Sequence, residues 1–215
     1  MTCCGHCRDA GDFFNERTAK RELKKYRRKG PEKSTRLLIE SIPDEAAANS
    51  TLLDIGGGIG AIPFELFKKG VQHSVNIDAS RAYQSVSKKE AAERGLKEKT
   101  EYHFGDFTDV APTLSSADIV TLDKVICCYP DVDLLLKSSL EKTESYYGLV
   151  FPRENFLTRI GFRLINLWFK IRRSEFRTFI HSHKKVDEII QSHGFRKKSQ
   201  DNTILWQIVS YKKAA

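Results

Sequence analysis

Residues 51–60 read Thr51-Leu-Leu-Asp-Ile-Gly-Gly-Gly-Ile-Gly60, and this stretch sets the expected fold class. Its apolar start predicts a buried strand, and the glycines after it predict a turn whose backbone approaches another group closely. A helical pattern follows over residues 61–69. A strand, a glycine turn and a helix N-terminus with unpaired N–H groups together form a site for a nucleotide-like ligand.

Apolar segments and helical patterns alternate after this turn. We expect strands at 74–77, 101–104, 118–122 and 147–151, and helices at 82–94 and 132–143. This alternation predicts an α/β fold, with a mostly parallel Rossmann-like sheet and helices on both faces. Ligands bind at the carboxyl ends of the strands in such a sheet.

A predicted N-terminal helical cap, residues 1–45, precedes the main domain, residues 46–215. The cap contains a strongly basic helix at 17–29 and a second helix at 32–42, and residues 43–50 read as a linker. The cap places the glycine turn well inside the chain, whereas many dinucleotide-binding domains have it near the start.

Composition limits the class of protein. The chain has 215 residues and a formal charge of +8, and one α/β domain with a full core is the default for this length. The positive excess is local: residues 1–36 hold eleven Lys and Arg against five Asp and Glu, and residues 153–173 hold six against one. Basic patches indicate an anionic partner such as nucleic acid, a membrane surface or an acidic small molecule.

The sequence has no apolar run long enough to cross a membrane and no apolar signal core at its N-terminus. With five cysteines, an odd number, these features predict a reducing cytoplasmic location rather than a disulfide scaffold. The cysteines are also candidate ligands of zinc or of an iron–sulfur cluster. They are Cys3, Cys4, Cys7, Cys127 and Cys128. The alternative is free thiols near the N-terminus, with the second pair as small buried residues.

Four acidic residues follow apolar runs, at or just past the expected strand ends: Asp54, Asp78, Asp106 and Asp123. A carboxylate after the second strand can accept both ribose hydroxyls, and one after the third can accept from the adenine amine. An acid beside the glycine turn suits an ammonium and would repel a pyrophosphate. The set matches S-adenosylmethionine. Gly56-x-Gly58-x-x-Ala61 also fits the dinucleotide fingerprint, which leaves an NAD-dependent oxidoreductase as an alternative.

Four motifs in the right order resemble those of class I S-adenosylmethionine-dependent methyltransferases. They are Leu53-Asp54-Ile55-Gly56-Gly57-Gly58-Ile59-Gly60, Asn76-Ile77-Asp78-Ala79-Ser80, Gly105-Asp106-Phe107, and Ala117-Asp118-Ile119-Val120 continuing into Asp123-Lys124. The resemblance covers residues 51–151 and implies a seven-stranded sheet with an antiparallel last strand, for which the segments 196–199 and 203–211 are suited. It also implies which residues bind the cofactor: Asp54, Gly56, Gly57, Gly58, Gly60, Asp78, Ala79, Ser80, Asp106, Phe107, Asp123 and Lys124.

A narrower resemblance is to magnesium-protoporphyrin IX O-methyltransferases, which methylate a propionate carboxylate. It rests on Phe14-Asn15 before the basic helix, on Val150-Phe151-Pro152-Arg153, and on the long helix beyond. Residues 152–183 are therefore expected to be a helical insertion on the substrate side. The helix at 156–173 has an apolar stripe and a basic face. It is expected to pack on the core, to cover a flat apolar or acidic substrate, or to make a peripheral contact with anionic lipid.

The sequence predicts a methyltransferase that acts on a small apolar or acidic molecule, by O-methylation. Candidate substrate-binding residues are Tyr26, Arg153 and Arg159. Candidate bases, needed only for a hydroxyl acceptor, are His181, His183 and Tyr129. An RNA methyltransferase that grips phosphates with the basic N-terminal helix is the main alternative. A module that binds the cofactor without transferring a methyl group is another.

Overall fold

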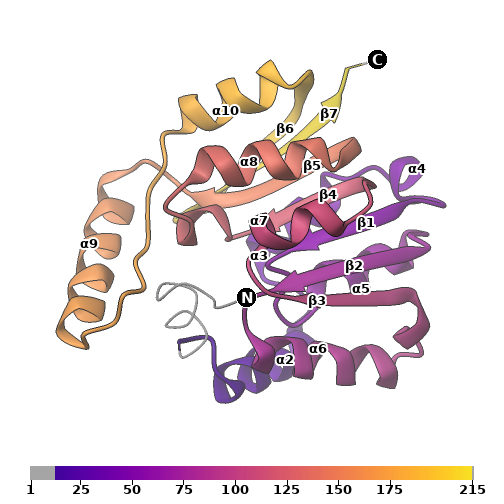
Figure 1. The fold of residues 1–215 in the computed structure, drawn as a ribbon, viewed down its shortest axis with the longest axis horizontal. Helices are drawn as coiled ribbons and strands as arrows, with labels where there is room; N and C mark the ends of the chain where they lie inside the picture. Colours follow the sequence, from indigo (N-terminus) through magenta and orange to yellow (C-terminus); the bar gives the residue numbers. More distant parts are fainter. Residues whose placement is uncertain (1–12, 215) are drawn as a thin grey trace.

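The computed structural model describes residues 13–214, and in this part of the chain seven strands form one mixed sheet in the order β3-β2-β1-β4-β5-β7-β6 (Figure 1). The strands are β1 Thr51–Ile55, β2 His73–Asp78, β3 Thr100–Phe104, β4 Ala117–Asp123, β5 Thr143–Pro152, β6 Phe195–Asn202 and β7 Trp206–Lys213. β1 to β5 run parallel, and β7 is antiparallel to both of its neighbours, β5 and β6. The predicted fold class is confirmed.

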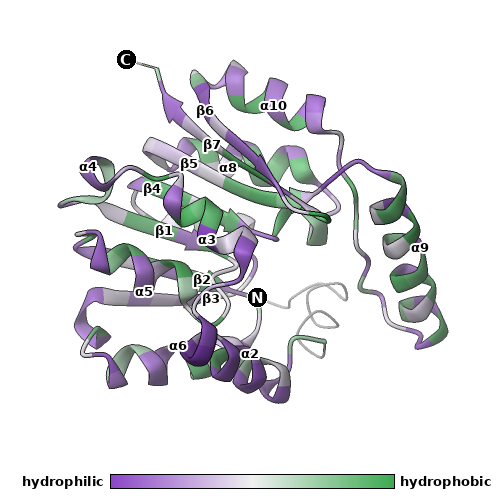
Figure 2. Cartoon of the chain, turned by 180° about the vertical axis from the view of Figure 1, so that it is seen from behind, coloured by the Kyte–Doolittle hydropathy of each residue, from purple (hydrophilic) through white to green (hydrophobic). Residues whose placement is uncertain are grey.

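The helices cover both faces of the sheet. They are α2 Glu16–Lys29, α3 Lys33–Glu40, α4 Asp44–Ala47, α5 Ala61–Lys68, α6 Arg81–Glu93, α7 Phe107–Val110, α8 Val132–Glu141, α9 Phe156–Ile171 and α10 His183–Ser192, with short 3-10 turns η1 Lys97–Lys99, η2 Ala111–Thr113 and η3 Ile126–Cys128. Figure 1 shows α8 and α10 on the near face, and Figure 2 shows α3 and α5 on the opposite face.

The alternation of side chains along each strand explains the two layers of core. Leu53 of β1 and Val120 of β4 belong to the cluster that α8 and α10 cover. Leu52 and Ile119, their neighbours in sequence, belong to the cluster that α3 and α5 cover. Because successive side chains of a strand point to opposite faces, an uninterrupted apolar run fits a strand covered on both sides.

The largest boundary difference from the sequence prediction lies where α8 meets β5. The helix expected at 132–143 ends at Glu141, and β5 begins at Thr143 rather than at 147. Thr143 pairs with Ala117 of β4, and its hydroxyl donates to the Ser139 carbonyl at 2.8 Å, which ends the helix and starts the strand. The expected linker at 43–50 contains the short helix α4.

The main correction concerns α9. Most of its predicted apolar stripe does not pack on the core: Phe156 is 75% exposed and Ile171 is 73% exposed. The helix stands beside the sheet rather than on it (Figure 1), and only Thr158 and Phe169 are buried. Phe169 packs against Phe13 and Phe176, with ring centroids 5.3 and 5.0 Å away. The alternative in which this stripe covers the core is therefore wrong.

Candidate active site

The glycine turn after β1 fits only residues without a side chain. Gly56 and Gly58 have φ values of +65° and +54°. A Cβ on Gly56 would lie 2.4 Å from Val125, and a Cβ on Gly57 would lie 2.1 Å from Asn76 Nδ2 and 2.8 Å from Asp54 Oδ2. These separations are too short for van der Waals contact, so the turn backbone rests directly on the side chains beneath it.

Buried polar groups without partners lie under this turn. Asp54 accepts a hydrogen bond from the Thr121 hydroxyl at 2.7 Å through Oδ1, but its Oδ2 has no hydrogen-bond partner. Both polar side-chain atoms of Asn76 are also unpartnered and buried. Burial, together with the nearby charges of Asp123 and Asp78, raises the pKa of Asp54 to about 8. Unpartnered buried groups are costly, which makes Asp54 a candidate for contact with a ligand.

Asp78 ends β2 and faces the same turn. Its carboxylate accepts hydrogen bonds from the backbone N–H groups of Gly58, at 2.9 Å, and of Ser80, at 2.6 Å. Burial raises the pKa of Asp78 to about 6, although these two bonds oppose the shift. The carboxylate is thus fixed in orientation by the backbone on both sides.

Asp106 follows β3 and caps α7. Its Oδ1 accepts from the backbone N–H and the hydroxyl of Thr108, at 2.9 and 2.8 Å. The Tyr129 hydroxyl also donates to this oxygen. The loop after β4, which carries Tyr129, is thereby tied to the end of β3.

Asp123 and Lys124 lie at the end of β4, where the chain turns away from the sheet. The Thr35 hydroxyl of α3 donates to Asp123, and Lys124 Nζ lies 3.1 Å from Glu32 and 3.7 Å from Asp123. Burial alone would lower the pKa of Lys124, but the charges of Asp123 and Glu32 outweigh it and raise that pKa. Lys124 has a φ of +62°, unusual for a residue with a side chain.

One cavity of about 820 Å³ joins these groups. We call one part of it the glycine-turn half, lined by Asp54–Gly58, Asp78–Ser80 and Asp106. The other is the α9 half, lined by Phe13, Phe14, Leu157, Phe162, Ile165, Phe169 and Phe176. The first is polar and sits at the strand ends. The second is apolar, and its lining is formed by α9 and by the segments that pack against α9.

Eleven of the twelve predicted cofactor-binding residues line this cavity. The exception is Gly60, which caps α5 with a φ of +86° and lies against Ser87 and Phe64. Phe107 lines the cavity at the start of α7. The Ser80 hydroxyl accepts from Tyr83 N and donates to the Phe14 carbonyl at 2.7 Å, so it joins α6 to the N-terminal segment.

One of the three predicted substrate-binding residues lines the cavity, and the other two do not. Tyr26 lines the cavity and donates to Glu65 at 2.7 Å. Arg153 and Arg159 do not line it. Arg153 donates to the Thr203 carbonyl at 3.0 Å and so joins the end of β5 to the β6–β7 turn. Arg159 lies on the exposed side of α9.

Of the three candidate bases, only Tyr129 lines the cavity. His181 Nε2 lies 2.9 Å from the Ile126 carbonyl and 3.0 Å from the Tyr129 carbonyl, which assigns the N–H to this nitrogen and makes it a support of that loop. Burial lowers the pKa of His181. His183 Nε2 lies 2.9 Å from the Pro152 carbonyl, and its ring packs on Phe151.

Cys127 and Cys128 both line the cavity, with their sulfurs 3.9 Å apart. The predicted ligands Cys3, Cys4 and Cys7 lie outside the described residues. Among residues 13–214, no three Cys, His, Asp or Glu side chains come together as a metal site.

Sequence reasoning missed several lining residues. Thr35 and Glu32 reach the cavity from the segment at the start of α3, and Val125 packs under Gly56. Asn76, which lies under Gly57 rather than in the lining, was quoted in a motif without a role; it is a polar residue between the apolar Val75 and Ile77. No sequence pattern marks Thr35, Glu32 or Val125, because their place in the cavity depends on how distant segments pack together.

Comparison with known proteins agrees with this geometry. A family model described as a methyltransferase domain matches residues 46–196, which is more than half of the chain. The chain belongs to this methyltransferase family. Membership confirms the predicted class I fold and S-adenosylmethionine as the cofactor, and it decides against the oxidoreductase alternative. A search of curated protein sequences gives no significant match.

Solved structures resemble the methyltransferase over most of its length. Magnesium protoporphyrin IX methyltransferase from Synechocystis with bound S-adenosylmethionine has a TM-score of 0.71 at 14% identity, and the match covers 97% of each chain. An O-methyltransferase family protein from Burkholderia thailandensis has a TM-score of 0.69 at 13% identity, covering 97% of this chain and 62% of that one. At these identities the likeness establishes a shared fold.

The residues of the glycine-turn half fit the cofactor. Gly56, Gly57 and Gly58 line the cavity with backbone alone, and the missing side chains of Gly56 and Gly57 let the turn pack tightly on Val125, Asn76 and Asp54 beneath it. Asp54 lines the cavity with its Oδ2 buried and unpartnered, and a cationic ligand bound beside it would favour the charged form of this carboxyl. Asp78 is held in place to accept hydroxyl hydrogen bonds.

Proposed function

We propose that the methyltransferase transfers the methyl group of S-adenosylmethionine to an oxygen atom of a small apolar molecule held in the α9 half of the cavity. The observation that carries this proposal is the lining of that half. Phe13, Phe169 and Phe176 form a continuous aromatic wall, with centroid distances between 5.0 and 6.1 Å. An apolar wall of this kind stabilises a ligand that buries apolar surface against it.

Different lining residues would bind the cofactor and position the acceptor. Asp78 would orient the ribose of the cofactor, and the positive charge of the cofactor would favour the charged form of Asp54. When bound, S-adenosylmethionine supplies an activated methyl group, so the protein mainly has to position the acceptor. We assign the contact with the acceptor to Tyr129, because it lines the cavity and its hydroxyl is held in place by Asp106.

A carboxylate-bearing acceptor, such as a porphyrin propionate, is the second candidate. The nearly full-length match to magnesium protoporphyrin IX methyltransferase favours it. Against it, both lysines of the lining are already engaged: Lys25 and Lys124 each pair with Glu32, at 2.5 and 3.1 Å. An acidic acceptor would have to displace Glu32, and an apolar acceptor would not.

Transfer of a radiolabelled methyl group tests the proposal. The full chain is incubated with labelled S-adenosylmethionine and, separately, a phenolic flavonoid, protoporphyrin IX, a fatty acid and bulk tRNA. The expected result is label in an organic-soluble product. Mild base releases methanol from a methyl ester and leaves a methyl ether intact, so it separates the two candidates. Tyr129→Phe is expected to lower turnover while cofactor affinity stays unchanged. Label found only in tRNA would instead support the RNA alternative.

A further inference from the structure

The side of α9 that faces away from the body is a stripe of exposed large apolar side chains. Phe156, Leu164 and Ile171 are 75%, 62% and 73% exposed. We define the α9 stripe as the residues Phe156, Ile160, Leu164, Leu167, Trp168 and Ile171. Scattered exposed apolar residues are ordinary, but a contiguous row on one helix marks a surface that meets something else.

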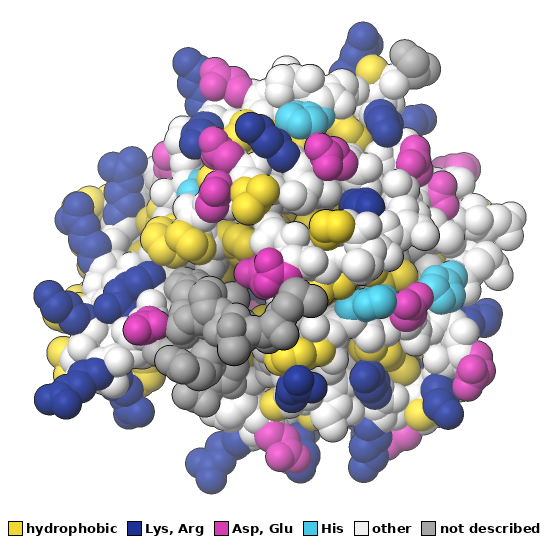
Figure 3. Space-filling view, in the orientation of Figure 1, with side chains coloured by type: hydrophobic (Ala, Val, Ile, Leu, Met, Phe, Trp, Pro, Cys, Tyr) yellow, Lys and Arg dark blue, Asp and Glu magenta, His cyan; other side chains and the backbone are white. Residues whose placement is uncertain are grey.

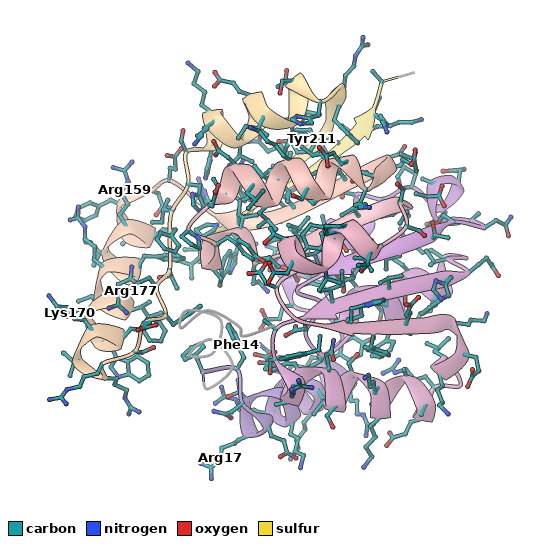
Figure 4. The ribbon with its side chains drawn as sticks, in the orientation of Figure 1. Phe14, Arg17, Arg159, Lys170, Arg177 and Tyr211 are labelled. Atoms are coloured by element: carbon teal, nitrogen blue, oxygen red, sulfur yellow. The ribbon has the colours of Figure 1, made fainter. Side chains whose placement is uncertain are left out.

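The stripe has a basic border. Arg159, Arg163 and Lys170 occupy the adjoining side of the helix at spacings of four and seven residues. Residues 156–173 contain no Asp or Glu. Figure 4 shows Arg159 and Lys170 pointing away from the body, and Figure 3 shows apolar side chains among the Lys and Arg at the left edge, which α9 occupies in Figure 1. The third side of α9 faces the cavity through Phe162 and Phe169.

We propose that α9 docks on the surface of an anionic phospholipid bilayer, with the α9 stripe in the interfacial layer and the basic border on the headgroups. Amphipathic helices with this arrangement lie in the plane of the membrane surface. Trp168, with Arg172 stacked 4.6 Å from its ring centroid, is of a residue type enriched at that depth. Within residues 13–214, no helix has the length and apolar character to cross a bilayer.

Charge favours a bilayer over other occupants. If a second copy covered the stripe, two α9 helices would bring Arg159, Arg163 and Lys170 close to the same residues of the partner, and like charges facing each other cost free energy. A nucleic acid would use the basic border and leave the apolar stripe exposed to water. Only an anionic, partly apolar surface would contact both the α9 stripe and the basic border.

Docking would place the cavity beside the lipid, because the stripe and the α9 half lie on two sides of one helix. The acceptor would then be a molecule that partitions into membranes. This consequence rests on the proposed function, whereas the docking itself does not, because it is measured without cofactor or acceptor.

Vesicle flotation of the full chain tests the docking. Vesicles of phosphatidylcholine containing about one third phosphatidylglycerol are expected to carry the protein, and phosphatidylcholine alone is expected to carry little. Leu164→Ser/Ile171→Ser is expected to weaken binding about tenfold or more. Arg159→Glu/Arg163→Glu is expected to do the same. Neither pair lines the cavity.

The matched controls separate docking from charge and folding. Arg196→Glu/Lys198→Glu makes the same change in net charge on β6, at the far edge of the sheet, and is expected to bind like the wild type. Leu164→Met/Ile171→Leu keeps the stripe apolar and is also expected to bind. The proposal is overturned if wild-type protein fails to float with the anionic vesicles or if the serine pair floats equally well. It is also overturned if sedimentation shows a dimer that the serine pair disperses.

Discussion

The glycine-turn half of the cavity is formed by short segments at the ends of strands, whereas the α9 half is formed by side chains from the N-terminal segment and from residues 157–176. In the first, Asp54 lies one residue before the end of β1 and accepts from the Thr121 hydroxyl, whereas Asp78 ends β2 and accepts from the backbone N–H groups of Gly58 and Ser80. In the second, Phe13, Phe169 and Phe176 meet only because α9 and the N-terminal segment pack together. We therefore expect ligand binding in the glycine-turn half to be sensitive to changes of single atoms. The α9 half should tolerate side chains of other shapes.

The largest expected effect concerns the buried charge of Asp54. Its pKa is about 8 in the folded chain against the usual 3.8, so the folded state holds the proton more tightly than the unfolded state. Stability therefore falls as the pH rises between these values. Relative to wild type without ligand, Asp54→Asn should gain up to about 5 kcal/mol from about pH 4 to pH 8. Urea unfolding across this range measures the gain, and a constant difference would contradict the assigned burial.

Gly57→Ala comes next, because it puts a methyl group where no space exists. The Cβ would lie 2.1 Å from Asn76 Nδ2. We expect a loss of about 1–3 kcal/mol in the free energy of unfolding, from overpacking. We also expect at least about a tenfold loss in affinity for S-adenosylhomocysteine, a loss worth about 1.4 kcal/mol. Denaturation and calorimetry measure the two effects. Unchanged affinity would show that the cofactor does not use this turn.

Asp78→Asn tests the other carboxylate of the glycine-turn half. We expect about 1–3 kcal/mol of cofactor affinity to be lost with the hydrogen bonds to the ribose. The matched control is Asp118→Asn. Asp118 accepts from the Thr51 N–H and hydroxyl, both at 2.8 Å, at the opposite end of the sheet. This control should lower the melting temperature and leave affinity alone. Equal losses of affinity in both variants would point to a general structural effect.

Gly161→Ala is the smallest change and the counterpart of Gly57→Ala in the α9 half. A Cβ on Gly161 meets nothing within 4 Å. In a helix, alanine is favoured over glycine by about 1 kcal/mol, so thermal stability should rise slightly. Cofactor affinity should not change. A marked loss of stability would mean that α9 packs more closely than the structure indicates.

The same contrast explains what the sequence alone could predict. β1 lies where expected, because an apolar run followed by glycines leaves few alternatives, and the four acids predicted at the strand ends all line the cavity. The exposed side of α9 could not be predicted, because periodicity gives an amphipathic helix but not its partner. Thr35 and Glu32 were missed for a related reason: the contact between α3 and the end of β4 joins residues about ninety positions apart.

The most direct test of the central claim is calorimetric titration of the full chain with S-adenosylhomocysteine and NAD in parallel. We expect one molecule of S-adenosylhomocysteine to bind per chain, Asp78→Asn to bind it more weakly, and NAD not to bind. Binding of NAD without binding of S-adenosylhomocysteine would contradict the central claim.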